Sequence, residues 1–79
     1  MKYEGLIFTL ADGSEYMVIE TVDIDGNIYA YLTNDKNDVD SFFGKIVDNN
    51  YGLSIENVSE EEFSEKVLPG FISKNYGTA

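Results

Sequence analysis

Three aspartates lie close together in a polar stretch, which makes this stretch the first candidate for metal chemistry. Asp35, Asp38 and Asp40 all fall between Asn34 and Ser41. Carboxylate oxygens are the ligands that calcium and magnesium prefer, so three such side chains could gather around a cation. Nothing in the stretch fixes their geometry, however, and clustered charges of one sign are commonly solvated loops. We therefore expect an exposed acidic loop and no metal site.

A second acidic stretch, Asp23-Ile24-Asp25-Gly26-Asn27, resembles the start of a calcium-binding loop. An EF-hand loop requires glycine at its sixth position and glutamate at its twelfth. A loop that starts at Asp23 has Ile28 and Asn34 at those positions, and a start at Thr21 corrects only the glycine. Since Asp-Gly is also a strong signal for a tight turn, we interpret this stretch as a β-hairpin turn.

The residue types that carry most enzymatic catalysis are missing from the chain. It has no histidine and no cysteine, which removes the commonest general base, thiolate nucleophiles and the usual zinc ligands. Serine remains as a nucleophile, but without histidine only a serine–lysine pairing could activate it, and no motif indicates one. We predict a protein that is not an enzyme and that holds no cofactor.

Two tyrosines, Tyr29 and Tyr31, alternate along one predicted strand and so share one of its faces. Tyrosine is a frequent anchor of protein interfaces, but it is also an ordinary strand residue that covers a half-buried sheet. Both interpretations stay open at this point. If the face is exposed, a protein-binding surface would combine these tyrosines, or the adjoining sheet edge, with the acidic side chains of Asp35, Asp38 and Asp40.

The charge of the chain limits its partners. Fifteen acidic residues stand against five lysines and no arginine among 79 residues, which gives a formal charge of −10. Such a chain repels nucleic acid and anionic membranes, so we expect neither as a direct partner. The charge favours a basic protein partner, or the mimicry of a polyanion such as DNA. A homo-oligomer that forms through a sheet edge is a further alternative.

The hydrophobic pattern predicts strands that are separated by turn signals. Alternating apolar residues indicate strands over 6–10, 15–24, 28–33, 42–47 and 53–56, and the strand over 15–24 changes phase, which indicates a bulge near Thr21. Short connections of this kind are typical of an antiparallel meander. The fold class that we predict is α+β, with four to five strands and one C-terminal helix that packs on one face of the sheet.

The C-terminal part carries a helix start signal and an apparent stop signal. Ser59 and Glu62 have the spacing of a capping box, in which the glutamate reaches back to the serine N–H. Pro69-Gly70 should end or kink the helix, so we expect it near 60–68. Before the tail frays, we expect Phe71 to dock on the core. The core that we predict consists of Phe8, Leu10, Ile19, Leu32, Ile46, Ile55, Phe63 and Val67.

Several of these segments together resemble the YrzB-like family of short acidic bacterial proteins of unknown function. The similar segments are Phe8 to Gly13, Tyr16 to Val22, Asp25 to Leu32 and Ser59 to Val67. The resemblance implies a meander followed by a helix and carries no catalytic residue across. Pro69-Gly70 departs from the pattern, because the helix of the family is expected to run on.

These observations predict one domain over 1–79, with an ordered core at about 4–72 and a frayed tail at 73–79. The first residues are polar and no apolar run is long enough for a signal peptide or a membrane span, from which we expect a cytoplasmic protein. The function that we predict is a small acidic protein-binding or adaptor module. The alternative is a polyanion mimic that inhibits a nucleic-acid-binding protein.

Overall fold

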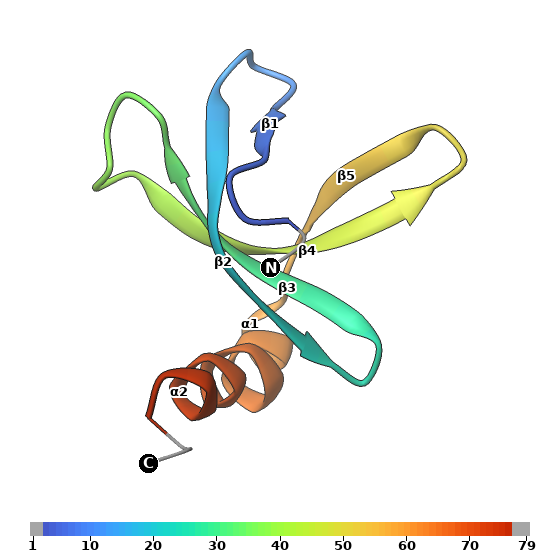
Figure 1. Ribbon diagram of the computed structural model, residues 1–79, viewed down its shortest axis with the longest axis vertical. Helices are drawn as coiled ribbons and strands as arrows, with labels where there is room; N and C mark the ends of the chain where they lie inside the picture. Colours follow the sequence, from blue (N-terminus) through green and yellow to red (C-terminus); the bar gives the residue numbers. More distant parts are fainter. Residues whose placement is uncertain (1–2, 77–79) are drawn as a thin grey trace.

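The strands pair in the order in which they occur along the chain, and every neighbouring pair is antiparallel. The computed structural model describes residues 3–76. Figure 1 shows the expected α+β meander, a strongly curled and nearly closed sheet followed by one helical segment. The elements are β1 (Ile7–Thr9), β2 (Glu15–Ile24), β3 (Asn27–Asn34), β4 (Ser41–Asn49), β5 (Gly52–Asn57), α1 (Glu60–Glu62), η1 (Phe63–Val67) and α2 (Leu68–Tyr76).

The turn between β2 and β3 confirms the hairpin interpretation of the Asp25-Gly26 pair. Asp25 has a φ of 55° and Gly26 a φ of 85°, which is the pair of positive angles that a type I′ turn requires. The carboxylate of Asp23 accepts a hydrogen bond from the backbone N–H of Gly26 at 3.2 Å. The aspartates of this stretch therefore shape a turn between two strands.

The predicted bulge exists, but it lies two residues earlier than expected. The pairing of β2 with β3 shifts register between Val18 and Glu20, so the extra residue is Ile19 and not Thr21. The side chain of Ile19 is 42% exposed, and its assignment to the core was wrong. The bulge turns Val18 and Thr21 toward the same face of the sheet, and both are buried.

The sheet buries side chains on both of its faces. The inner face, which is the one away from the helix, carries a cluster around Tyr16, Val18, Ala30, Leu32 and Ile46, with Phe8, Leu10 and Ile55 partly buried against it. The helix face contributes Tyr29 to a second cluster, which Val67 and Phe71 complete from the helical segment, with Phe63 partly buried among them. Apart from Ile19, all the predicted core residues belong to one of these two clusters, which we call the inner cluster and the helix cluster.

The helical segment begins as predicted but does not end at Pro69-Gly70. Ser59 caps it by accepting the backbone N–H of Glu62 at 3.1 Å. The chain then widens into one π-helical stretch, in which the N–H of Leu68 bonds to the carbonyl of Phe63, and continues as α2. Pro69 lacks an N–H, and a π turn directly before it is a known way to absorb the disruption. Our expectation that the helix stops near residue 68 was wrong.

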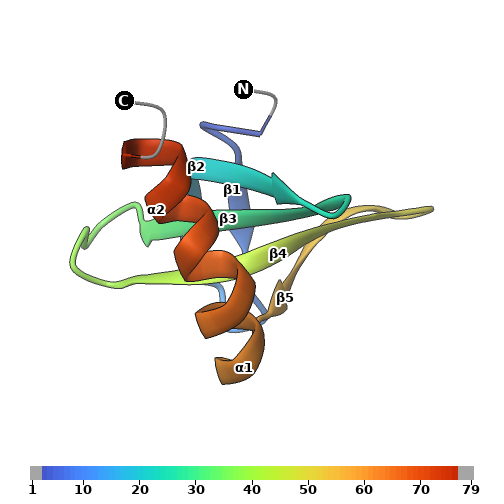
Figure 2. The same ribbon diagram turned by 90° about the horizontal axis from the view of Figure 1, so that it is seen from below.

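The second half of the helical segment packs against the sheet (Figure 2). Phe71 is buried in the helix cluster, so it docks on the core as expected. Residues 73–76, which we expected in a frayed tail, form the last turn of α2, and 77–79 lie outside the described residues. No helix within 3–76 is long and apolar enough to cross a membrane.

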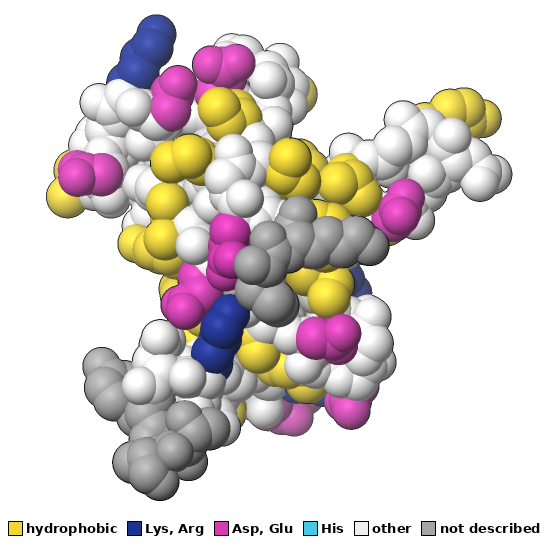
Figure 3. All heavy atoms as spheres, viewed as in Figure 1, with side chains coloured by type: hydrophobic (Ala, Val, Ile, Leu, Met, Phe, Trp, Pro, Cys, Tyr) yellow, Lys and Arg dark blue, Asp and Glu magenta, His cyan; other side chains and the backbone are white. Residues whose placement is uncertain are grey.

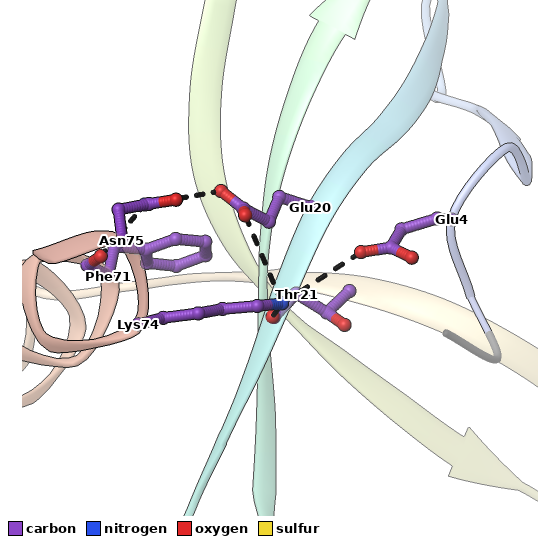
Figure 4. Close-up of polar contacts among 6 residues, drawn as sticks. All are labelled: Glu4, Glu20, Thr21, Phe71, Lys74 and Asn75. Atoms are coloured by element: carbon purple, nitrogen blue, oxygen red, sulfur yellow. Dashed lines mark hydrogen bonds and ion pairs between the residues drawn. The ribbon is translucent and has the colours of Figure 1, made fainter. Parts of the chain in front are cut away.

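Lys74 connects the end of α2 to the sheet (Figure 4). Its ammonium group donates to the backbone carbonyl of Thr21 and lies 3.9 Å from a carboxylate oxygen of Glu4 and 4.0 Å from one of Glu20. The Thr21 hydroxyl itself is buried and has no hydrogen-bond partner among the described residues. These contacts hold the end of the helix on β2, whereas the Thr21 side chain lies on the inner face of the sheet and takes no part in the attachment.

Candidate functional site

Tyr29 and Tyr31, the two candidate interface tyrosines, lie on the helix face of the sheet. Tyr29 is fully buried in the helix cluster. Its hydroxyl donates to a carboxylate oxygen of Glu62 at 2.5 Å, and the ammonium of Lys45 lies 3.7 Å from the same oxygen. Tyr31 belongs to the same cluster and is half-buried. The helix covers this face, so Tyr29 cannot anchor a partner protein.

The contact with Glu62 is structural. Burial of the ring and the hydrogen bond to this carboxylate raise the pKa of Tyr29 from 10.0 to about 12. The Glu62 carboxylate thus turns toward Tyr29, and no hydrogen bond joins it to the Ser59 N–H as the capping box predicted. Only the serine half of the box is present.

The predicted acidic loop is exposed and shaped by its own polar groups. The side-chain oxygens of Asn34 and Asn37 each accept a backbone N–H two residues ahead. Asp40 turns toward the inner face, where its carboxylate accepts the Tyr16 hydroxyl at 2.8 Å and raises the pKa of that phenol. Asp35 and Asp38 are exposed. Among residues 3–76 no three acidic side chains are placed to hold a metal ion.

The loop lies beside the turn that connects β1 and β2. The backbone N–H of Asp35 donates to the carbonyl of Glu15 at 3.2 Å, and a hollow of about 310 Å³ lies between the two segments. The charged residues that line it are Asp12, Glu15 and Asp35, with Lys36 as the one cation among its lining residues. Hydrogen bonds from the Ser14 backbone and hydroxyl lower the pKa of Asp12. The result is a concentration of negative charge at the end of β1.

Between β1 and β5 the curled sheet remains open, and we call this opening the seam. The two edge strands do not pair with each other. A groove of about 390 Å³ runs between them, lined by residues 7–11 on one side and 53–55 on the other. Ile7 is 54% exposed and Leu53 is 39% exposed. Figure 3 shows hydrophobic side chains between the β1–β2 turn and the β4–β5 hairpin.

The backbone of β1 offers free hydrogen-bonding groups toward the seam. The Leu6 carbonyl accepts from Val18, and the Leu10 N–H donates to Ser14, so these residues direct their backbone groups at β2. Backbone groups of an antiparallel edge strand alternate between partner and solvent. Ile7 and Thr9 therefore present their N–H and carbonyl groups to the seam, and no hydrogen bond to them is found within the described part of the chain.

The β5 edge is equally unprotected. It reads Gly-Leu-Ser-Ile-Glu-Asn and contains no lysine and no proline. Proteins usually block an exposed edge strand with these residues or cover it with another segment. Leu53 and Ile55 alternate on one face of β5, and Ile55 reaches the inner cluster. The seam thus combines two open backbone edges with an apolar floor.

A further hollow offers little chemistry. It has a volume of about 490 Å³ and is lined by Tyr3, Lys45, Asp48 and Glu56, together with apolar and backbone groups of the β2–β3 turn and β4. The ammonium of Lys45 is already engaged by Glu62. This hollow lacks a nucleophile that lies beside a base, which is the arrangement that covalent catalysis requires.

Comparison with protein families, curated proteins and solved structures gives no match for the chain. The resemblance to the YrzB-like proteins therefore rests on the residues alone and stays a hypothesis. The site that we identify differs from the predicted one. The acidic loop at Asp35, Asp38 and Asp40 remains exposed and lies beside the β1–β2 turn, at one end of the seam, while the Tyr31 hydroxyl bonds to Ser41 directly after the loop at 3.1 Å. A mid-strand glycine, Gly44, is the one sequence signal that could have indicated the curl.

Proposed function

We propose that the chain is a small acidic module that works in the cytoplasm by binding another protein, without catalysis, and that the partner binds along the seam. The observation that carries this proposal is the coincidence of exposed apolar side chains, Ile7 and Leu53, with unpaired backbone edges on both sides of one groove. Edges of this kind readily pair with another chain, and apolar patches rimmed by polar residues are typical of interaction sites.

The acidic loop supports the proposal as a steering element. Charges at the rim of an interface mainly accelerate encounter, whereas the buried apolar part slows dissociation. Asp35 lies in the acidic hollow beside Asp12, and Asp12 directly follows the groove-lining residue Ala11. A positively charged partner that approaches this loop would arrive at one end of the seam.

Capture from extracts of the source cell with two charge-matched variants tests the proposal. Leu53→Lys and Ile72→Lys both replace an exposed apolar side chain by lysine, but Ile72 lies on α2, away from the seam. A protein that the wild type and Ile72→Lys capture and that Leu53→Lys loses supports binding at the seam. Equal capture by all three forms, with both variants folded, would exclude this surface.

The alternative function, mimicry of a polyanion, requires carboxylates arrayed along one face at the spacing of phosphates. On the face that Figure 3 shows, the acidic side chains are scattered among hydrophobic and uncharged ones. A dispersed pattern of this kind gives solubility and a long-range field but no imitation of a phosphate backbone. We therefore favour the protein-binding module.

A further inference from the structure

The seam has the form of a sheet from which one strand is missing. Ile7 and Thr9 direct backbone groups into it from one side, and alternate residues of β5 do so from the other. The groove between them has a volume of about 390 Å³. At about 30 Å³ for each water, this is room for roughly a dozen waters or for several side chains. The space suits a short segment of extended chain better than a bulky folded element.

The side chains at the seam specify an alternating pattern for such a segment. Phe8, Leu10 and Ile55 are only partly buried at the margin of the inner cluster. An added strand directs every second side chain toward them, and burial is favourable only if these side chains are apolar. Its other side chains point outward, toward solvent and the acidic rim, and can be charged.

The charge of the residues around the seam determines which charge is favourable on those outward side chains. Residues 6–24 contain no lysine, and neither do residues 46–57. The acidic residues of these segments include Asp12 and Glu15 near the end of β1 and Glu56 on β5. A second copy of the chain would bring another ten net negative charges, so self-association works against repulsion, whereas a basic segment is attracted.

We propose that the seam binds an extended segment of a partner protein, with basic and apolar residues in alternation, which adds as a strand between β1 and β5. This is the peptide-recognition mode in which backbone pairing gives affinity and alternate side chains give specificity. The length of the edges limits the segment to roughly the six residues of β5. The inference rests on the proposed function, because it identifies the partner of the same site.

A synthetic hexapeptide in which lysine alternates with valine is the probe. We expect it to bind the full chain and to slow the hydrogen exchange of the Ile7 and Thr9 amides by about tenfold or more, because these N–H groups gain partners. The same peptide with glutamate in place of lysine tests the charge. A version with proline in place of the central valine tests backbone pairing. Both should bind at least about tenfold more weakly.

Protein variants locate the peptide. Leu53→Lys should weaken binding by about tenfold, since it adds a like charge and removes an apolar contact at the groove. Ile72→Lys makes the same chemical change on α2 and should leave the affinity within about twofold. Binding should also weaken as salt is raised, because the attraction between the peptide and the acidic rim is screened.

Three results would overturn the inference. The first is the absence of binding at millimolar peptide. The second is binding that perturbs Asp35 to Asp40 without protecting the Ile7 and Thr9 amides. The third is a dimer of the free chain with those amides already protected, which would make a second copy the occupant. In the first two cases, capture from cell extract that still depends on Leu53 would keep the proposed function. Loss of that dependence would remove the proposed function itself.

Discussion

Gly70 lies where α2 packs closely on Ile24 of the sheet, and its replacement by alanine has two opposing effects of similar size. A Cβ at this position would overlap the Cδ1 of Ile24 and would lie 3.5 Å from the Cγ2 of Val22. Alanine is more favourable than glycine in a helix by about 1 kcal/mol. An extra carbon in a packed core usually costs about 1–3 kcal/mol. We therefore expect Gly70→Ala to change stability by about 0–2 kcal/mol, in the destabilising direction.

A second substitution separates the two effects. Ile24→Val removes the Cδ1 that the new methyl group would overlap, at its own cost of about 0.5–1.5 kcal/mol. In this background the steric conflict is gone and the helix preference remains. Gly70→Ala should then stabilise the protein by up to about 1 kcal/mol. The two substitutions should therefore be coupled favourably by about 1–3 kcal/mol.

Urea denaturation of the wild type, both single variants and the double variant measures this coupling, provided that the denaturant slopes agree. Ile28→Val is the matched control, because Ile28 packs on the inner face and should show no coupling to Gly70. If Gly70→Ala alone stabilises the protein, or if the coupling with Ile24→Val is no larger than with the control, then the helix does not approach β2 as described.

Three further predictions concern polar groups of the sheet and of the helix start. Tyr29→Phe should cost about 1.5–3 kcal/mol at neutral pH, since its hydroxyl donates to a charged carboxylate. Because the folded protein raises the pKa of Tyr29 from 10.0 to about 12, the wild type should lose this advantage as pH rises from about 10 to 12, which denaturation at each pH would reveal. Thr21→Val should raise stability by about 1 kcal/mol, because the buried hydroxyl has no partner in the described residues; a lower melting temperature would contradict this. Ser59→Ala should cost about 0.5–2 kcal/mol because the helix loses its cap. Glu62→Ala should cost no less, because it leaves the Tyr29 hydroxyl buried without an acceptor. If the urea midpoint of Glu62→Ala lies closer to the wild type than that of Ser59→Ala, Glu62 acts only as the second half of a capping box.

The sequence was informative wherever a local rule determines the structure. The Asp25-Gly26 turn follows from the positive φ angles that these residue types tolerate, and the cap at Ser59 follows from the need of a helix for an N-terminal acceptor. It misled where tertiary contacts override the local rule. Pro69-Gly70 is a strong local stop signal, yet the missing side chain of Gly70 is what lets α2 lie against Ile24. The Pro-Gly pair alone cannot show whether a helix ends there or packs closely on the sheet there.

The same limit explains why the sequence does not show that the helix covers Tyr29. In β3, Tyr29 and Tyr31 alternate with Ala30 and Leu32, so both faces are apolar and the pattern alone cannot show which one the helix covers. The π stretch and the helix beyond Pro69 supply the cover, and neither is visible in the periodicity. The alternative that these tyrosines serve sheet packing is the one that agrees with the structure at Tyr29.

The seam depends on the curl of the sheet, which we attribute to the close approach of strands in the middle of β4. Gly44 pairs with Ala30 on one side and with Asn57 on the other, and a Cβ there would lie 2.8 Å from the Cγ2 of Ile55 and 3.3 Å from the Glu56 carbonyl oxygen. Small residues at this crossing allow neighbouring strands to approach and the sheet to coil. The coil brings β1 and β5 toward each other, yet β1 has only three residues and the sheet stays open. The residues that curl the sheet thus lie apart from those that line the seam, which is why no single stretch of the sequence could reveal it.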